Sequence, residues 1–342
     1  MGNAKTKPAK KLAKTKKPFD GSFGRDPTLN PADYTCKGLR EAIVVRKPGS
    51  INGQQFVLED CAQCSIFLLD HCTSVTIDQC TDCTIFIGPC TASLFVRDCT
   101  RSTLVCVVQQ FRTRDCRDMD IELMCATAPI IETSTNLRIG CYRSSYFALP
   151  DQLAKASFSI WNNKWSEVFD FTPAAGNWKF VACLPERWPS AVHQRLPTDV
   201  LQEVGYSEDV AQSISPITHG LHHRSPDGDV GFVCVSTGNS LLALDIAHLA
   251  LRNPCLKLIQ TRQFRVTAKQ AARLFEKEAA HKKNASVHDL IAMEWAGKGI
   301  EPMLRAIVQE DRVKPHAGTI YVNVARGKDK CELCWSTWKE EI

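Results

Sequence analysis

Residues 64–99 read CSIFLLDHCTSVTIDQCTDCTIFIGPCTASLFVRDC, and this stretch repeats one pattern of a short apolar run followed by a polar corner. Within residues 56–141 the apolar runs recur every eight to ten residues. They are Ile66-Phe67-Leu68, Val75-Thr76-Ile77, Ile85-Phe86-Ile87, Leu94-Phe95-Val96 and Leu104-Val105. Each run is too short for an ordinary helix and has the β-branched or aromatic composition of a strand. Since one such unit cannot bury its apolar face alone, the repeat predicts stacked coils, and we predict a right-handed parallel β-helix from about Leu39 to Ile139.

Cysteine is unusually frequent, with 17 residues in the chain and 11 of them between Cys61 and Cys141. A disulfide framework would require secretion, whereas this chain begins with lysines and has no apolar signal segment. Zinc is a second alternative, because three pairs have ligand-like spacing. These pairs are Cys61/Cys64, Cys80/Cys83 and Cys331/Cys334. The first two continue the repeat and no Cys/His pair lies at zinc-finger distance, so we favour reduced thiols that fill the inner corners of the coils. We expect no metal site and no cofactor.

The net charge of +5 is unevenly distributed. The first 17 residues contain no acidic residue and seven lysines, namely Lys5, Lys7, Lys10, Lys11, Lys14, Lys16 and Lys17. Subtracting these seven charges from +5 leaves −2 for the rest of the chain. A nucleic-acid-binding protein more often carries its basic charge on the fold itself, so we expect no nucleic-acid partner.

The N-terminus Met1-Gly2-Asn3-Ala4-Lys5-Thr6 matches the pattern for N-myristoylation of Gly2. One myristoyl chain binds a membrane weakly, and adjacent lysines add attraction to an anionic lipid surface. We therefore predict that residues 1–35 form a flexible, acylated basic arm at the cytoplasmic face of the plasma membrane. The alternative is a soluble or nuclear-targeting arm.

Beyond the repeat, the chain divides into further segments. The aromatic stretch 142–188 is predicted to cap the solenoid within a domain of residues 36–190, and a linker is predicted over residues 191–229. Residues 230–342 are predicted to form a ferredoxin-like α/β domain with the core order βαββαβ and one further helix between its second and third strands. Its strands are expected at 230–235, 256–266, 289–295 and 319–324, and its helices at 240–251, 268–280 and 302–308. No run of about 18 apolar residues is present, so we expect no transmembrane helix.

The repeat changes character at residues 109–116, which read QQFRTRDC. Two amides and two arginines stand here where neighbouring coils carry apolar residues. In an extended strand Arg112 and Arg114 face the same side, and Glu132 lies close enough in the repeat to pair with one of them. A solvated face with an internal ion pair is the alternative interpretation. The chain shows no Ser-His-Asp arrangement, no catalytic carboxylate pair and no phosphate loop, which argues against unaided chemistry on a small molecule.

Several motifs within residues 36–190 resemble the tubulin-folding-cofactor-C domain family. They are PGSINGQQF at 48–56, IFIGP at 85–89, QQFRTRDC at 109–116, PIIE at 129–132, NNKW at 162–165 and DFTP at 170–173. Residues 230–325 are similar to a nucleoside-diphosphate-kinase-like domain. They lack the kinase's Asn-x-x-His-Gly-Ser-Asp motif, and His316 lies in a different setting, so we expect no kinase activity.

The resemblance implies a GTPase-activating protein for an Arf-like small GTPase in its GTP form, at the membrane or at the base of a cilium or flagellum. It places Arg112 at the position of an arginine finger. Gln109 matches an amide that helps build the catalytic contact, and Glu132 matches an acid that positions the site. Phe171 and Arg114 are expected at the partner-binding surface.

Other functions remain open at this point. A tubulin-folding cofactor that stimulates GTP hydrolysis by tubulin would use the same finger. A non-catalytic membrane scaffold that binds the GTP-form GTPase would leave Arg112 and Glu132 as a structural pair. A sugar-cleaving β-helix enzyme would require secretion and a cleft of carboxylates, so it is disfavoured.

Overall fold

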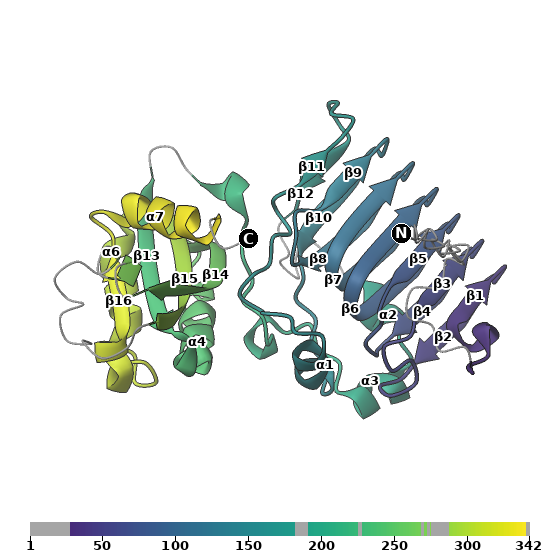
Figure 1. Cartoon of the computed structure of the whole chain (residues 1–342), viewed down its shortest axis with the longest axis horizontal. Coiled ribbons are helices and arrows are strands. Elements are labelled where there is room, and N and C mark those ends of the chain that lie inside the picture. Colours follow the sequence, from purple (N-terminus) through teal and green to yellow (C-terminus); the bar gives the residue numbers. More distant parts are fainter. Residues whose placement is uncertain are drawn as a thin grey trace, which may run out of the picture.

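The computed structural model describes residues 28–181, 191–224, 228–267, 270, 271, 274 and 287–339. Figure 1 shows two units, a parallel β-helix and an α/β domain beside it. Both confirm the predicted fold class. Among the described residues, no helix is long and apolar enough to cross a membrane.

Twelve strands form the β-helix, and every pair of neighbours among them is parallel. The strands are β1 (Thr35–Lys37), β2 (Ile43–Arg46), β3 (Phe56–Glu59), β4 (Ser65–Leu68), β5 (Val75–Asp78), β6 (Thr84–Arg97), β7 (Thr103–Arg114), β8 (Asp120–Cys125), β9 (Ile130–Glu132), β10 (Leu137–Cys141), β11 (Phe169–Asp170) and β12 (Trp178–Phe180). Strands β11 and β12 come from the segment expected to be an irregular cap, and they add a further coil beyond β10.

The coils turn at two stacked columns of residues in the left-handed backbone region, with φ between 45° and 56°. One column is Asp60, Gln79, Asp98, Asp115 and Thr133, and the other is Gln63, Asp82, Arg101, Asp118 and Asn136. Acidic and amide side chains tolerate this conformation better than most. The residue after each member of the first column points inward and is small, being cysteine in four coils and Ser134 in the last. The prediction of buried thiols at the inner corners is therefore confirmed.

The two long faces of the β-helix differ in what covers them. One face, here called the covered sheet, comprises β2, β4, β8, β10, β12 and the first halves of β6 and β7. Its outward side chains, such as Phe67 and Phe86, pack against helices α1 (Leu149–Lys155), α2 (Ala191–Arg195) and α3 (Thr198–Val204). The other face, here called the bare sheet, comprises β1, β3, β5, β9, β11 and the second halves of β6 and β7. None of the described α-helices has its main contacts on the bare sheet, and the short 3-10 helix Pro31–Tyr34 lies beside β1 at its end.

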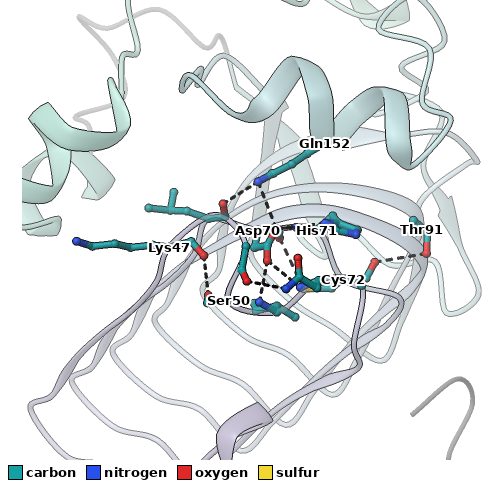
Figure 2. A network of polar contacts seen from close by, with 12 residues as sticks. Lys47, Ser50, Asp70, His71, Cys72, Thr91 and Gln152 are labelled. Atoms are coloured by element: carbon teal, nitrogen blue, oxygen red, sulfur yellow. Dashed lines mark hydrogen bonds and ion pairs between the residues drawn. The ribbon is translucent and has the colours of Figure 1, made fainter. Parts of the chain in front are cut away.

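Asp70, two residues after the end of β4, ties the covered sheet to helix α1 (Figure 2). Its carboxylate is 2% exposed and accepts hydrogen bonds from the backbone N–H groups of Ile51 at 2.7 Å and Asn52 at 2.8 Å. Gln152 of α1 reaches the same carboxylate at 3.4 Å and donates to Leu69 O at 3.0 Å. Burial opposes the charge, but the backbone donors outweigh it and lower the pKa of Asp70.

The α/β domain has four antiparallel strands in the order β14-β15-β13-β16, as a ferredoxin-like fold requires. Its elements are β13 (Asp229–Ser236), α4 (Ser240–Leu251), β14 (Lys257–Thr267), β15 (Val287–Gly297), α6 (Ile300–Val308), β16 (Ile320–Asn323) and α7 (Gly327–Lys339). Helices α4 and α6 cover one face of the sheet, and α7 packs on the other. Helix α7 was not predicted from the sequence. Most of the helix expected at 268–280 lies outside the described residues.

Candidate functional site

Strand β7 crosses from the covered sheet to the bare sheet, where it presents Arg112 and Arg114 outward. Both side chains are exposed, and the residues that alternate with them, Phe111 and Thr113, are buried. Arg114 lies 3.4 Å from Asp115, between Nε and Oδ2. Arg112 makes no ion pair and no hydrogen bond through its side chain within the part of the chain that the structure describes. Its guanidinium is therefore held on a rigid coil without a partner of its own.

Apolar side chains flank Arg112 on the bare sheet. The parallel register places Phe95 of β6 beside it on one side and Ile130 of β9 on the other, and Phe169 of β11 follows Ile130. In-register neighbours on adjacent strands are about 4.8 Å apart, so these four side chains form one continuous row. Phe95 is 38% exposed and Phe169 is 54% exposed. The guanidinium thus emerges from an apolar surface.

Phe171 lies next to this row. Its backbone N–H donates to Ile131 O at 2.9 Å, and its ring packs edge-on against Phe169 with centroids 4.8 Å apart. Phe171 is 59% exposed, so the two rings pack on each other without being buried. Aromatic side chains exposed in this way are typical of a protein-binding surface.

The structure corrects one expectation about Glu132. This residue is the register partner of Arg114 on the neighbouring strand, as its place in the repeat suggested. No ion pair joins it to Arg112 or Arg114 among the described residues, because Arg114 lies instead beside its sequence neighbour Asp115. Glu132 is exposed and its carboxylate points to solvent, so it is available to a partner.

Gln109 lies at the corner of β7, three residues before Arg112. The carbonyl of Gln109 accepts a hydrogen bond from the backbone N–H of Thr127 at 3.2 Å and another from the Thr127 hydroxyl at 3.0 Å. These two bonds fix the backbone of Gln109. The side chain of Gln109 is exposed. Gln110 differs, because its amide oxygen accepts a hydrogen bond from Ser93 Oγ at 3.0 Å. The structure therefore places Arg112 and Glu132 on neighbouring strands of the bare sheet, and Gln109 is exposed where β7 turns into that sheet.

The three described cavities of the protein lie away from this surface. Cavities of about 430, 580 and 640 Å³ lie between α4 and α6, beside α3, and at the first coil, and residues 109–114 line none of these three. Within the described part of the chain, no cluster of His, Cys, Asp or Glu side chains has the arrangement of a metal site. Gly2 and the seven lysines from Lys5 to Lys17 lie outside the described residues.

Sequence reasoning missed three members of the surface, namely Phe95, Ile130 and Phe169. Phe95 belongs to a predicted strand, and its alternation with buried Leu94 and Val96 could have placed it outward. Its position beside Arg112 depends on the length of the intervening coil, which the apolar period gives only approximately.

The parallel β-helix that carries Arg112 is the domain by which the chain is assigned to proteins of the cofactor C type. The family model described as Tubulin binding cofactor C matches residues 53–171. The chain is 41% identical over 266 residues to Protein XRP2 of Gallus gallus, covering 76% of this chain and 72% of the relative. It is 37% identical over 300 residues to Protein XRP2 of Homo sapiens, covering 86% and 84%. The chain belongs to the XRP2 family.

The solved structure of Tubulin Binding Cofactor C from Leishmania major is also similar. It is 26% identical, with a TM-score of 0.30, and the match covers 34% of this chain and 83% of that chain. The resemblance drawn from the sequence motifs is confirmed by the family assignment.

Proposed function

We propose that this chain is a GTPase-activating protein for an Arf-like small GTPase in its GTP form, and that Arg112 is its arginine finger. The observation that carries the proposal is the exposed, unpaired guanidinium of Arg112 on a sheet that no described α-helix covers. Membership of the cofactor C type, whose family description names a tubulin-binding protein, supports a partner that hydrolyses GTP.

The chemistry of the residues suits this role. A guanidinium stays charged at any physiological pH and offers a planar fork of donors to phosphate oxygens. When inserted into a partner's nucleotide site, it stabilises the charge that develops on the transferring phosphoryl group, and such fingers accelerate hydrolysis by about 10³–10⁵. The exposed amide of Gln109 would contact the finger and the partner's catalytic loop, and the carboxylate of Glu132 would hold a basic or N–H group of the partner.

Phe169, Phe171 and Arg114 would supply partner binding. Exposed aromatic rings that become buried on association commonly dominate interface energetics, whereas a charged residue at the rim affects mainly association rate and orientation. The proposed division of labour is therefore binding through the aromatic pair and rate acceleration through Arg112.

The test is single-turnover GTP hydrolysis by candidate Arf-like GTPases in the presence of this protein. We expect acceleration by the wild type and its loss in Arg112→Ala, with binding of the GTP form retained. The matched control is Arg101→Ala, since Arg101 is also exposed on the β-helix but is paired with Asp82 at 2.8 Å. If Arg112→Ala accelerates hydrolysis as well as the wild type, the finger assignment is wrong.

A tubulin-folding cofactor is the second candidate, favoured by the description of the matching family. It would use the same surface on a different GTPase. Parallel measurement of phosphate release from tubulin and from Arf-like GTPases separates the two candidates. Binding of the GTP form without any acceleration would instead indicate a non-catalytic scaffold.

We also propose that the N-terminal arm places the protein at the cytoplasmic face of the plasma membrane, at the base of a cilium or flagellum. The proposal rests on the myristoylation pattern at Gly2 and the seven lysines that follow. Metabolic labelling with a myristate analogue tests it, with Gly2→Ala as the control. Equal labelling of both proteins would exclude acylation at Gly2.

A further inference from the structure

One short segment, residues 159–167, joins the two units of the molecule and is here called the strap. Its two tryptophans are four residues apart and are buried in different cores. Trp161, 2% exposed, belongs to the core of the α/β domain, and Trp165, 1% exposed, belongs to the core of the β-helix. The strap is thus anchored on both sides at once.

On the side of the α/β domain, the strap binds β14, an edge strand of the sheet. Asn162 accepts a hydrogen bond from Gln263 N at 2.8 Å and donates to Gln263 O at 3.3 Å. The hydroxyl of Thr261 donates to Trp161 O at 2.8 Å. The two bonds of Asn162 satisfy the backbone groups of Gln263 on this edge strand, and the bond from Thr261 fixes the backbone of Trp161.

An ion pair completes this contact. Arg262 of β14 is 4% exposed and its Nη2 donates to the carboxylate of Glu167. A buried guanidinium requires a charged partner, since desolvation without one is costly. Glu167 is the residue of the strap that supplies this partner.

On the side of the β-helix, the strap is hydrogen-bonded to the last residue of β8. Asn163 Oδ1 accepts from Cys125 N at 3.0 Å, and Lys164 N donates to Cys125 O at 2.7 Å. The indole N–H of Trp165 donates to Thr218 Oγ1 at 2.8 Å. The end of β8 is therefore fixed to the middle of the strap.

The strap leads directly into β11, which carries Phe169 and is followed by Phe171. Strand β11 has two residues and pairs with β9 alone, at the end of the β-helix nearest the α/β domain (Figure 1). Besides the ladder between β9 and β11, Phe169 N donates to Pro129 O at 2.8 Å and Phe171 N donates to Ile131 O at 2.9 Å. An edge strand this short has little stability of its own, so its position depends on the segments attached to it.

We infer that the α/β domain positions the aromatic pair of the GTPase-binding surface through the ion pair between Arg262 and Glu167. Both are positioning residues, because Arg262 is buried and Glu167 bonds to it rather than to a reacting group. The functional part of this inference rests on the proposed function, whereas its structural part does not. The α/β domain then sets how tightly the GTPase binds, and Arg112, on a separate strand, sets how fast it hydrolyses GTP.

The experiment uses the full chain with the double change Glu167→Gln and Arg262→Met, which removes the ion pair without leaving a buried charge. The matched control is Arg265→Met, which removes an exposed ion pair to Asp289 from the same strand. Thermal unfolding confirms that each variant is folded. Two quantities are then measured, the hydrogen exchange rate of the peptide that contains residues 168–172, and the kinetics of stimulated GTP hydrolysis.

We expect exchange in this peptide to be about tenfold faster in the double variant, and KM for the GTP-form GTPase to rise about tenfold at unchanged kcat. The control should change neither quantity. Unchanged exchange in the double variant would overturn the inference and leave the proposed function intact. If exchange is faster in the double variant but the wild type stimulates no Arf-like GTPase, the proposed function is wrong and the positioning role is retained. A fall in kcat at unchanged KM would contradict the division between binding and catalysis.

Discussion

At the scale of single residues, substitutions of Arg112 can separate the effect of its positive charge on GTP hydrolysis from the effect of its planar shape. The side chain has no partner among the described residues, so its replacement removes nothing that holds the β-helix together. A lysine at this position keeps a positive charge but presents one ammonium group where the guanidinium offers a planar fork. The proposed role depends on that fork.

We expect Arg112→Lys to lose most of the stimulated hydrolysis, about 10²-fold or more, because a finger contributes about 10³–10⁵ in rate. Binding of the GTP-form GTPase should change less than threefold, since the exposed aromatic pair remains. Single-turnover hydrolysis and equilibrium titration measure the two quantities. Arg101→Lys serves as the control, and retained acceleration by Arg112→Lys would show that charge alone suffices.

Glu122 gives a second residue-scale expectation, and it concerns stability. Its carboxylate is 3% exposed and burial raises its pKa to about 7, although Arg143 lies 3.2 Å away. Because the folded protein holds this proton more tightly than the unfolded chain, the contribution of Glu122 to stability is complete below the unfolded pKa of about 4.5 and is lost as the pH rises to about 7.

Glu122→Gln should remove that dependence. Relative to the variant, the free energy of unfolding of the wild type should fall by about 3 kcal/mol between pH 4 and pH 8. Urea unfolding at several pH values measures the difference. Glu301→Gln is a suitable control, since this glutamate is exposed on α6 and paired with Arg305. A difference between wild type and Glu122→Gln that does not vary with pH would show that folding does not raise the pKa of Glu122.

At the scale of elements, the close packing of α1 and its flanking residues on the β-helix depends on one glycine. An added Cβ at Gly88 of β6 would lie 2.6 Å from Asp70 O and 3.1 Å from Leu68 O, both backbone atoms, and 3.0 Å from the Tyr146 hydroxyl. Backbone atoms of a stacked coil cannot move aside independently, because each coil is bonded to its neighbours.

Gly88→Ala should therefore destabilise the protein by about 1–3 kcal/mol, as overpacking of a well-packed interior does. Chemical denaturation monitored by far-UV circular dichroism measures the effect. Gly318→Ala is the control, because no atom lies within 4 Å of the Cβ it would add. Equal stabilities of the two variants would mean that the coil yields at this position.

Helices and strands were predictable from the sequence where the residues that determine them are close together in the chain. The strand-and-corner period identifies the coils, since alternating apolar residues and turn-forming corners are properties of neighbouring residues. The strands and helices predicted for the α/β domain and described in full lie within two residues of their observed ends. Helix α7 has a weak sequence signal because two of its buried positions are Cys331 and Cys334, whose spacing also suits metal ligands.

The functional surface was only partly predictable for a different reason. Arg112 and Glu132 were identified from motif and repeat, but their neighbours depend on register across coils. Between β6 and β7 the register shifts near Cys90 and again before Ser93, so the side chain beside Arg112 cannot be read from a constant period. The surroundings of the finger are set by long-range pairing, which one sequence specifies weakly.

At the scale of the whole molecule, the strap joins the β-helix and the α/β domain because it contributes one buried side chain to the core of each. The strap carries Trp161 into one core and Trp165 into the other, so neither core is complete without it. Two units connected in this way are expected to unfold together, whereas units joined by a plain linker unfold separately.

Trp161→Ala should uncouple them. The loss of a buried tryptophan costs about 3–5 kcal/mol, and here the cost falls on the α/β domain, so one cooperative transition should become two with the α/β domain unfolding first. Calorimetry resolves the transitions, and hydrogen exchange of β15 and β7 assigns each to its unit. Trp165→Ala is the reciprocal variant, because it removes the same side chain from the other core and should lower the stability of the β-helix first. A single transition with the same midpoint in both variants would show that the two tryptophans do not stabilise separate cores. The contact that couples the two units would then lie outside the strap.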